Sequence, residues 1–200
     1  MKLFSTLALS AALALASLGN AAEVGKAAPD FKLPGLKART VSLSQFKGKT
    51  VVLEWVNQGC PFVRKHYGSG NMQALQKKYT DKKVVWLSIS SSSKGNEGYW
   101  DGPKDAAAFK DAQKASMTDI LLDHDGTAGH AYGAKTTPHM FVIDPKGILV
   151  YQGAIDDKPS TKQEDIAGAK NWVAQALDEV LAKKAVSVAE TRSYGCSVKY

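Results

Sequence analysis

Residues 51–66 constrain the fold of this chain more than any other stretch. They begin with the apolar run Val51 to Leu53, which is typical of a buried strand. Cys60 comes later in the same stretch, and Pro61 follows it directly. Proline is favoured at the first position of a helix, because its missing N–H would be unpaired there in any case. We therefore expect a strand, a turn and a helix, with Cys60 at the start of the helix.

A cysteine in this position favours the reactive thiolate. The unpaired backbone N–H groups and the dipole at a helix N-terminus stabilise negative charge, which lowers the pKa of a thiol there. The basic residues Arg64, Lys65 and His66 suit the surface of the same helix. Arg64 and Lys65 would lower the pKa of Cys60 further, although Arg64 fits a solvated position equally well. The competing interpretation is a buried, inert cysteine in the turn.

Glu54 is a second candidate for chemistry, because it lies inside the apolar strand six residues before Cys60. A carboxylate is costly to bury as an anion, so burial would raise the pKa of Glu54. A buried acid beside a cysteine turn is typical of a tuned site. The alternative is that Glu54 points to solvent from an edge strand.

The first residues, 1–22, are predicted to be a signal peptide. Lys2 gives a positive start, residues 3–18 are apolar, and small residues follow. The apolar run is too short for a comfortable membrane span. We predict cleavage after Ala21 or Ala22, which gives a periplasmic or secreted protein with no stable membrane anchor. A retained N-terminal anchor is the alternative.

The remainder fits one globular domain over residues 23–186 and a C-terminal tail over residues 187–200, since 44% of the residues are hydrophobic and 22% are charged. The net charge is +7 with scattered lysines, which indicates a basic surface and no nucleic-acid partner.

A strand, a helix and a second strand in succession predict a right-handed parallel crossover. The further predicted elements are strands at 84–89, 120–123 and 148–153, an apolar strand that begins at Pro138, and helices at 72–79, 103–115 and 164–184.

The mature chain holds two cysteines, Cys60 and Cys196. An even pair in an exported protein suggests a disulfide, because export leads to an oxidising compartment. The bond would enclose 135 intervening residues and would constrain the unfolded chain by about 4–5 kcal/mol in the loop-closure treatment. That figure favours a permanent structural bond as well as a reversible catalytic couple, and both remain open.

The order of strand, turn, Cys-Pro and basic helix resembles the thioredoxin superfamily. Within it, the chain resembles the redoxin branch, which includes the alkyl hydroperoxide reductase and thiol-specific antioxidant proteins. The segment 24–49, which ends in Phe-Lys-Gly-Lys before the first core strand, is similar to the redoxin N-terminal region. The resemblance covers residues 24–181. It implies an α/β thioredoxin-like fold, with a central mixed β-sheet flanked by helices and an N-terminal redoxin extension.

The resemblance also implies roles for individual residues. Pro138 matches the cis-proline of the superfamily, so the Thr137–Pro138 bond is expected to be cis and to pack against Cys60. Glu54 matches the buried acid of thioredoxins, which implies a general acid/base role in disulfide exchange. We expect Thr137, Pro138 and Asn57 to contact the substrate.

Two departures from the family patterns shape the functional prediction. Val63 stands where the related reductases carry the second cysteine of Cys-x-x-Cys. Peroxiredoxins carry Pro-x-x-x-Thr/Ser-x-x-Cys, and here Leu53 and Asn57 occupy the Pro and Thr/Ser positions. We therefore predict a thiol–disulfide oxidoreductase with no bound cofactor, in which Cys60 is the nucleophile and Cys196 is the resolving partner. Reaction with peroxide is expected to be slow.

Two alternatives remain beside this prediction. One is a peroxiredoxin-like thiol peroxidase that uses the same nucleophile. The other is a non-enzymatic or metal-binding protein of the same fold. His139 directly follows Pro138 and is expected near Cys60, where it could join Cys60 and Cys196 in a copper or zinc site. A lone histidine is usually structural, so no metal is predicted. The predicted partners are protein thiols and disulfides or peroxide, and the sequence does not identify the redox partner protein.

Overall fold

The computed structural model describes residues 21–200. The predicted signal peptide, residues 1–22, therefore lies almost entirely outside the described residues. Within the described part of the chain, no helix has the length and apolar character needed to cross a bilayer.

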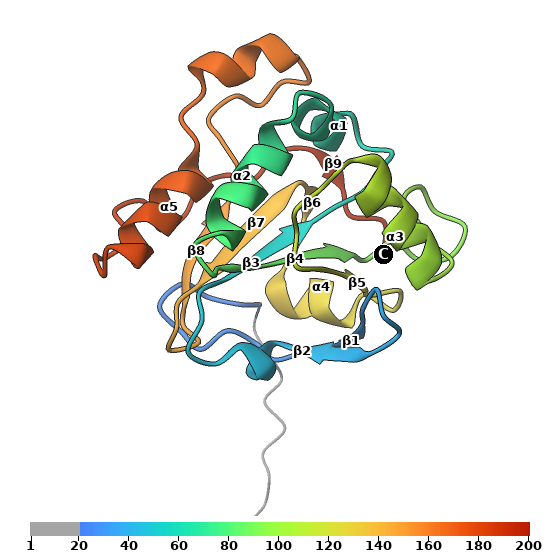
Figure 1. Ribbon diagram of the computed structural model, residues 1–200, viewed down its shortest axis with the longest axis horizontal. Helices are drawn as coiled ribbons and strands as arrows, with labels where there is room; N and C mark the ends of the chain where they lie inside the picture. The colour runs from blue at the N-terminus through green and yellow to red at the C-terminus, as the bar shows by residue number, and fades with distance from the viewer. Residues whose placement is uncertain (1–20) are drawn as a thin grey trace, which may run out of the picture.

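A five-stranded sheet forms the centre of the fold (Figure 1). Its strands are β3 (Val51–Trp55), β4 (Val85–Ser90), β5 (Asp119–Leu122), β7 (His139–Ile143) and β8 (Leu149–Gly153). They lie in the order β5-β4-β3-β7-β8, in which β3, β4 and β5 are parallel and β7 and β8 are antiparallel to their neighbours. Parallel neighbours need a crossover, and the chain between β3 and β4 supplies it as two helices, α1 (Pro61–Gly68) and α2 (Asn71–Thr80). The mixed sheet that we predicted is confirmed.

Two layers cover the two faces of this sheet (Figure 1). One layer contains α1, α2, α3 (Pro103–Ala112) and α5 (Trp172–Leu181). The other contains α4 (Thr127–Tyr132), the hairpin β1 (Lys32–Pro34) and β2 (Thr40–Ser42), and the 3₁₀ helix η1 (Leu43–Phe46). Successive side chains of β3 enter opposite layers, so Val52 packs under α1 and Leu53 packs under α4. Every residue of β3 is buried, and Cys60 follows this central strand after residues 56–59.

The predicted helix over residues 164–184 is wrong in its extent. The structure divides it into a 3₁₀ helix, η2 (Gln163–Gly168), and the later helix α5. The break has a local cause, because Asn171 is the N-cap of α5 and its side chain accepts a hydrogen bond from the N–H of Ala174 at 2.8 Å. An N-cap residue has extended backbone, so α5 cannot continue upstream through it.

The C-terminal tail, residues 187–200, is docked on the domain. A short strand in the tail, β9 (Cys196–Ser197), pairs antiparallel with β6 (Thr136–Thr137). The final residue, Tyr200, donates its hydroxyl to the carbonyl of Ala134 at 2.7 Å. The tail therefore packs on the domain through both its backbone and its last side chain.

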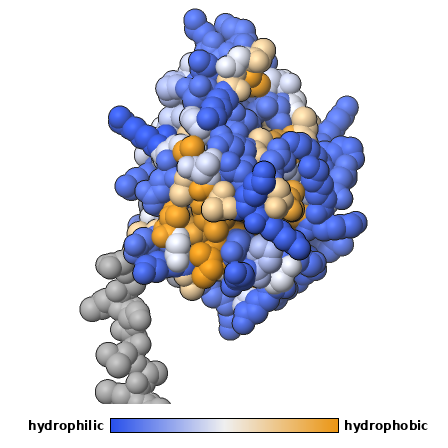
Figure 2. Space-filling view, turned by 90° about the vertical axis from the view of Figure 1, so that its left-hand side faces the viewer, coloured by the Kyte–Doolittle hydropathy of each residue, from blue (hydrophilic) through white to orange (hydrophobic). Residues whose placement is uncertain are grey.

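The tail also covers the edge strand β8. Residues 189–191 exchange two backbone hydrogen bonds with Gln152, at 3.0 and 3.1 Å. Figure 2 shows the side of the molecule that carries α5 and β8 in Figure 1. Hydrophilic residues cover most of this side, and apolar residues gather in one patch near the start of the described chain. On this side, the two hydrogen bonds to Gln152 pair the edge of the central sheet that β8 forms.

Candidate active site

Cys60 lies between the end of β3 and the start of α1, as predicted. It is the N-cap residue of α1, and Pro61 occupies the first turn of that helix. The N–H of Cys60 donates to the carbonyl of Asn57 at 3.1 Å, which closes the turn. The Cys60 side chain has no accessible surface. The sulfur is therefore at a helix N-terminus but is covered by other residues.

Asn57 holds the shape of this turn. Its Oδ1 accepts a hydrogen bond from the N–H of Gly59 at 2.8 Å, and its Nδ2 donates to the carbonyl of Glu97 at 3.0 Å. The side chain is buried. Both ends of the amide are thus engaged inside the protein, so Asn57 positions Cys60 and joins the turn to the loop that carries Glu97.

Thr137, which precedes Pro138, reaches Cys60 from a distant part of the sequence. The Thr137–Pro138 peptide bond is cis, as the resemblance implied. The Cys60 thiol donates to the carbonyl oxygen of Thr137 at 3.0 Å. The hydroxyl of Thr137 is buried and has no hydrogen-bond partner among residues 21–200 when Cys60 is a neutral thiol. This hydroxyl is placed to donate to the sulfur once the sulfur carries negative charge.

Cys196 comes to the same place on the C-terminal tail. It is the register partner of Thr137 in the β6–β9 ladder. The thiol of Cys196 lies beside that of Cys60, where each group shifts the pKa of the other, and both are free thiols. The fold therefore brings together two cysteines that 135 residues separate in the chain. Two thiols in contact can be converted to a disulfide by loss of two electrons and two protons.

The pKa of the Cys60 thiol is lowered from its ordinary value. Burial raises this pKa, but hydrogen bonds from Thr137, from the thiol and backbone of Cys196, and from the backbone of Val63 outweigh the effect of burial. The predicted thiolate-favouring site therefore has a physical basis in donors from three separate segments. The helix start supplies part of it through Val63, which lies in the first turn of α1.

The basic residues of α1 do not surround Cys60 as the sequence suggested. Arg64 is exposed, and its Nε donates to the carbonyl of Gln58 at 3.1 Å. Lys65 and His66 are buried, so their predicted place on the helix surface is wrong. Nζ of Lys65 donates to the carbonyl of Lys158 at 2.8 Å. The groups that lower the pKa of Cys60 are Thr137, Cys196 and Val63 rather than these basic side chains.

Lys65 and His66 instead belong to a buried polar network that holds the tail. The hydroxyl of Tyr194, two positions before the tail cysteine, donates to Asp156 and lies 3.2 Å from Nε2 of His66. Asn71 lies 2.9 Å from Nδ1 of His66, and Nζ of Lys65 lies 3.9 Å from Asp156. If His66 is neutral and protonated at Nε2, every donor in this hydrogen-bonded network has an acceptor. Burial lowers the pKa of His66 to about 4, although the charge of Asp156 opposes the shift.

The two cysteines differ in their tendency to ionise. Burial raises the pKa of Cys196 to about 11, and the hydrogen bond to Cys60 and the charges of Cys60 and Glu97 act in the same direction. The charge of Lys199 opposes them. Cys60 is therefore the thiol of the pair that ionises first. Glu97 carried no sequence signal, because it reaches the site only through the folded loop.

Glu54 is a buried acid, as predicted, and it has no accessible surface. The edge-strand alternative is wrong, because β3 lies between β4 and β7. Burial raises the pKa of Glu54, although hydrogen bonds to its carboxylate oppose the shift. The four donors to this carboxylate are Tyr67 at 2.8 Å, Trp86 at 2.8 Å, Ser88 at 2.9 Å and Gln76 at 3.2 Å.

His139 does not lie with Cys60, and that expectation is wrong. Its ring packs 4.5 Å from that of Phe141, and its register partner in β3 is Trp55. Phe141 and Trp55 belong to the layer under α4, whereas Cys60 belongs to the layer under α1. Nδ1 of His139 accepts from the backbone of Lys135 at 3.2 Å. Across the described part of the chain, no three histidine, cysteine or acidic residues gather as metal ligands.

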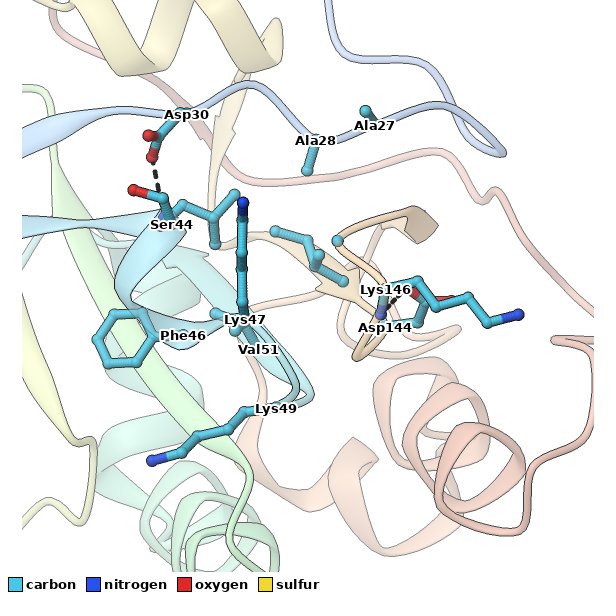
Figure 3. A pocket seen from close by; sticks show the side chains of 13 residues that line it. Ala27, Ala28, Asp30, Ser44, Phe46, Lys47, Lys49, Val51, Asp144 and Lys146 are labelled. Atoms are coloured by element: carbon cyan, nitrogen blue, oxygen red, sulfur yellow. Dashed lines mark hydrogen bonds between the residues drawn. The ribbon is translucent and has the colours of Figure 1, made fainter.

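A hollow of about 300 Å³ lies at the end of β3 that is farther along the chain from Cys60, where this strand begins (Figure 3). Val51 and Ile143 are among its apolar lining residues. In Figure 3, Lys49 and Lys146 border the hollow with their amino groups directed outward. Neither cysteine lines it. The hollow is therefore separate from the Cys60 site.

Comparisons with known proteins agree with this geometry. The sequence profile of the AhpC/TSA family matches residues 24–152. The thioredoxin-like protein YneN of Bacillus subtilis (strain 168) is 30% identical over 145 residues, which cover 71% of this chain and 79% of that protein. The thiol-disulfide oxidoreductase ResA of Bacillus thuringiensis subsp. konkukian (strain 97-27) is 25% identical over 131 residues, or 65% and 69% of the two chains. A solved structure of a conserved protein from Geobacillus kaustophilus superposes with a TM-score of 0.75 at 25% identity, covering 90% of this chain and 94% of that chain.

Proposed function

The chain belongs to the AhpC/TSA family of thioredoxin-like proteins, and on this premise we propose that it is an exported thiol–disulfide oxidoreductase. Cys60 is the nucleophile and Cys196 is the resolving cysteine. The observation that carries the proposal is the contact between these two thiols beside Thr137. The likeness to a protein named thiol-disulfide oxidoreductase supports the same class of reaction.

The reaction begins with the Cys60 thiolate, which attacks one sulfur of a substrate disulfide. A mixed disulfide between Cys60 and the substrate forms, and the other substrate sulfur leaves as a thiolate. Cys196 then attacks the Cys60 sulfur, which forms the Cys60–Cys196 disulfide and releases the remaining substrate thiolate. The substrate is reduced by two electrons and the cysteine pair is oxidised by two. A thiol partner protein returns the pair to its reduced state.

The raised pKa of Cys196 gives this order of events a physical reason. Part of the shift comes from the hydrogen bond and charge of Cys60. Once Cys60 is bound in a mixed disulfide, its sulfur carries no charge, and that part of the shift is removed. Cys196 therefore becomes a better nucleophile at the step in which it must act.

The remaining predicted site residues have supporting roles in the proposal. The Thr137 hydroxyl donates to the Cys60 thiolate, and Thr137 and Pro138 form the wall against which the substrate lies. Glu54 acts as a general acid/base, supported by its burial, by its raised pKa and by its contact with Tyr67 on α1. Protein thiols and disulfides are the proposed substrates.

The experiment that tests this function measures reduction of a test protein disulfide, such as insulin, by the protein with and without each cysteine. We expect Cys60→Ser to abolish turnover. We expect Cys196→Ser to stop after one event, with substrate trapped on Cys60 as a mixed disulfide. Turnover that survives Cys60→Ser, or a Cys196→Ser variant that turns over at the original rate, would contradict the proposal.

A thiol peroxidase is the alternative reaction for the same nucleophile. Its support is weaker, because Asn57 stands where peroxiredoxins carry Thr or Ser, and its amide is engaged in backbone contacts. We expect Cys60 to consume hydrogen peroxide slowly and to pass through a sulfenic acid when it does. Fast peroxide turnover that depends on Cys60 would reverse the ranking of the two reactions.

The proposal also includes the organisation of the chain. Residues 1–22 are removed on export, residues 23–186 form the domain, and residues 187–200 form a tail that supplies Cys196. N-terminal sequencing of the exported protein tests the first of these statements. The expected first residue is Ala22 or Glu23, and a retained Met1 would contradict cleavage.

A further inference from the structure

We propose that the tail segment 195–197 occupies the position that a substrate segment must take. The tail then leaves β6 when substrate binds, and it returns when Cys196 resolves the mixed disulfide. The inference rests on the proposed oxidoreductase function and adds a partner surface and a gate to it. The partner is an extended, cysteine-bearing segment of a disulfide-bonded protein, which pairs with β6 in place of β9.

The first argument is that Cys60 is closed off. Its side chain has no accessible surface, and its sulfur contacts the carbonyl of Thr137 and the thiol and backbone of Cys196. Disulfide exchange requires the attacking sulfur to reach a substrate sulfur directly. Thr137 belongs to the sheet region next to the central strands, whereas Cys196 belongs to the tail. The tail is therefore the part of this cover that can move without disrupting the core.

The second argument is that the tail is held on β6 as a strand. Thr137 pairs with Cys196, and Thr136 pairs with Ser197. The ladder continues with a hydrogen bond from the N–H of Val198 to the carbonyl of Lys135 at 3.1 Å. Backbone pairing of this kind does not depend on side-chain identity, so another extended segment can form it. β6 thus already binds a strand that places a cysteine beside Cys60.

Gly195 restricts which segments fit this position. Its φ is +134°, and a Cβ at this residue would overlap the carbonyl oxygen of Thr137. The tail approaches β6 this closely because glycine has no side chain. A substrate segment in the same register therefore needs glycine, or a locally different backbone, at the position before its cysteine.

The tail is anchored by a tyrosine on each side of Gly195, and the downstream tyrosine is the more exposed of the two. Upstream, the ring of Tyr194 packs 5.8 Å from that of Phe62, and its hydroxyl joins the buried network described above. Downstream, Tyr200 stacks on His130 at 4.1 Å and donates its hydroxyl to the carbonyl of Ala134, but it is 38% exposed. We expect the tail to open from its C-terminal end, with Gly195 as the joint.

Space beside the tail is available for this movement. Two hollows, of about 700 and 390 Å³, both border residues 191–193. The larger also reaches Gly195 and Thr136, next to the β6–β9 ladder. An incoming segment therefore has an open approach to the ladder from the side of Trp172 and Asp157.

Competition for β6 links the chemistry to product release. With the substrate segment on β6, Cys196 is held away and the mixed disulfide on Cys60 persists. When the tail pairs again, Cys196 attacks the Cys60 sulfur, the Cys60–substrate bond breaks, and the substrate leaves as a thiolate. The same movement that forms the Cys60–Cys196 bond displaces the substrate from its strand position.

The test is the rate at which iodoacetamide alkylates Cys60 in the reduced, full mature chain with Cys196→Ser, so that one thiol is followed. Rates are compared on the high-pH plateau of the alkylation profile, where Cys60 is fully ionised, so that a change in its pKa does not affect the comparison. We expect Gly195→Ala to raise this rate at least about tenfold, because its methyl group pushes β9 from β6. Gly147→Ala is the matched control, since Gly147 also has a positive φ, +82°, with free space around it.

A second variant protects the test against misfolding. Tyr200→Ala removes the stacking on His130 and the hydrogen bond to Ala134 at the chain end, and it leaves the core untouched. It should also accelerate alkylation of Cys60, while thermal unfolding reports that the domain stays folded. If both variants alkylate at the rate of the parent and the control, the gate is wrong. The proposed function is tested separately, by whether the wild-type chain forms the Cys60–Cys196 disulfide at all.

Discussion

The carbonyl oxygen of Thr137 lies 3.0 Å from the sulfur of Cys60, and the same residue is the register partner of Cys196. Thr137 therefore joins the two cysteines through its backbone. Its hydroxyl is the polar group of the side chain, and it is buried without a partner among the described residues, which points to a chemical role. The predictions below start from this residue and move outward.

Replacing Thr137 with valine should raise the pKa of Cys60. Valine keeps the shape of threonine but removes the hydroxyl that donates to the thiolate. The measurement is the pH profile of Cys60 alkylation in a Cys196→Ser background. With Thr137 present we expect its midpoint below the ~8.5 of a free cysteine, and with Thr137→Val we expect a higher midpoint. Thr136→Val is the control, because the Thr136 hydroxyl donates to the carbonyl of Pro138 instead. Equal midpoints in the two variants would remove the role given to Thr137.

Trp86→Phe should destabilise the protein and change how its stability depends on pH. The substitution deletes one of the four donors to the buried Glu54 carboxylate, which we expect to cost about 1–3 kcal/mol of unfolding free energy. Trp55→Phe is the matched control, since Trp55 is equally buried but donates to Ser91 on the other face of the sheet. Urea unfolding at pH 5 and pH 8 measures how the stability of each variant depends on pH. A pH dependence altered equally by both variants would disagree with this account.

Glu54→Gln should become relatively more stabilising as the pH rises. The pKa of Glu54 is raised above its ordinary 4.5, so the folded state holds the proton more tightly than the unfolded state. The stability linked to that proton is fully present below about pH 4.5 and is lost as the pH rises through the folded pKa. Glutamine does not titrate and escapes this loss. A stability difference between the two proteins that stays constant from pH 4 to pH 8 would contradict a raised pKa.

His66→Gln should reduce the loss of stability in acid. Burial lowers the pKa of His66 from 6.5 to about 4, so its contribution is present above pH 6.5 and is lost as the pH falls towards 4. The variant should therefore lose about 3 kcal/mol less than the parent between pH 7 and pH 4. His139→Gln serves for comparison, because burial also lowers the pKa of His139 to about 4. His66 contacts Tyr194 in the tail, so its substitution alone should also speed alkylation of Cys60.

Local patterns made the centre of the site predictable from the sequence. The apolar run before Cys60 and the proline after it specify a strand, a turn and a helix within a short stretch, and the structure has all three. The cis bond at Pro138 followed from the family resemblance. The helix over residues 164–184 was predicted too long, because its apolar spacing continues through the region where the Asn171 side chain caps α5.

The surroundings of the site could not be predicted in the same way. Lys65 and His66 are buried because Asp156 and Tyr194 satisfy them, and these partners lie at least 90 residues away in the chain. The count of cysteines pointed to Cys196, but its place beside Cys60 depends on two-residue strands held by backbone pairing. Backbone pairs of this length leave no side-chain pattern to detect.

The most direct test of the account is to map the disulfides that form when the reduced mature protein reacts with oxidised glutathione. Digestion without reductant, followed by mass spectrometry, identifies each linked pair of peptides. The account predicts that glutathione attaches first to Cys60 and is then displaced, which leaves a peptide pair joined through Cys60 and Cys196. Glutathione that persists on Cys60 while Cys196 stays a free thiol would contradict it.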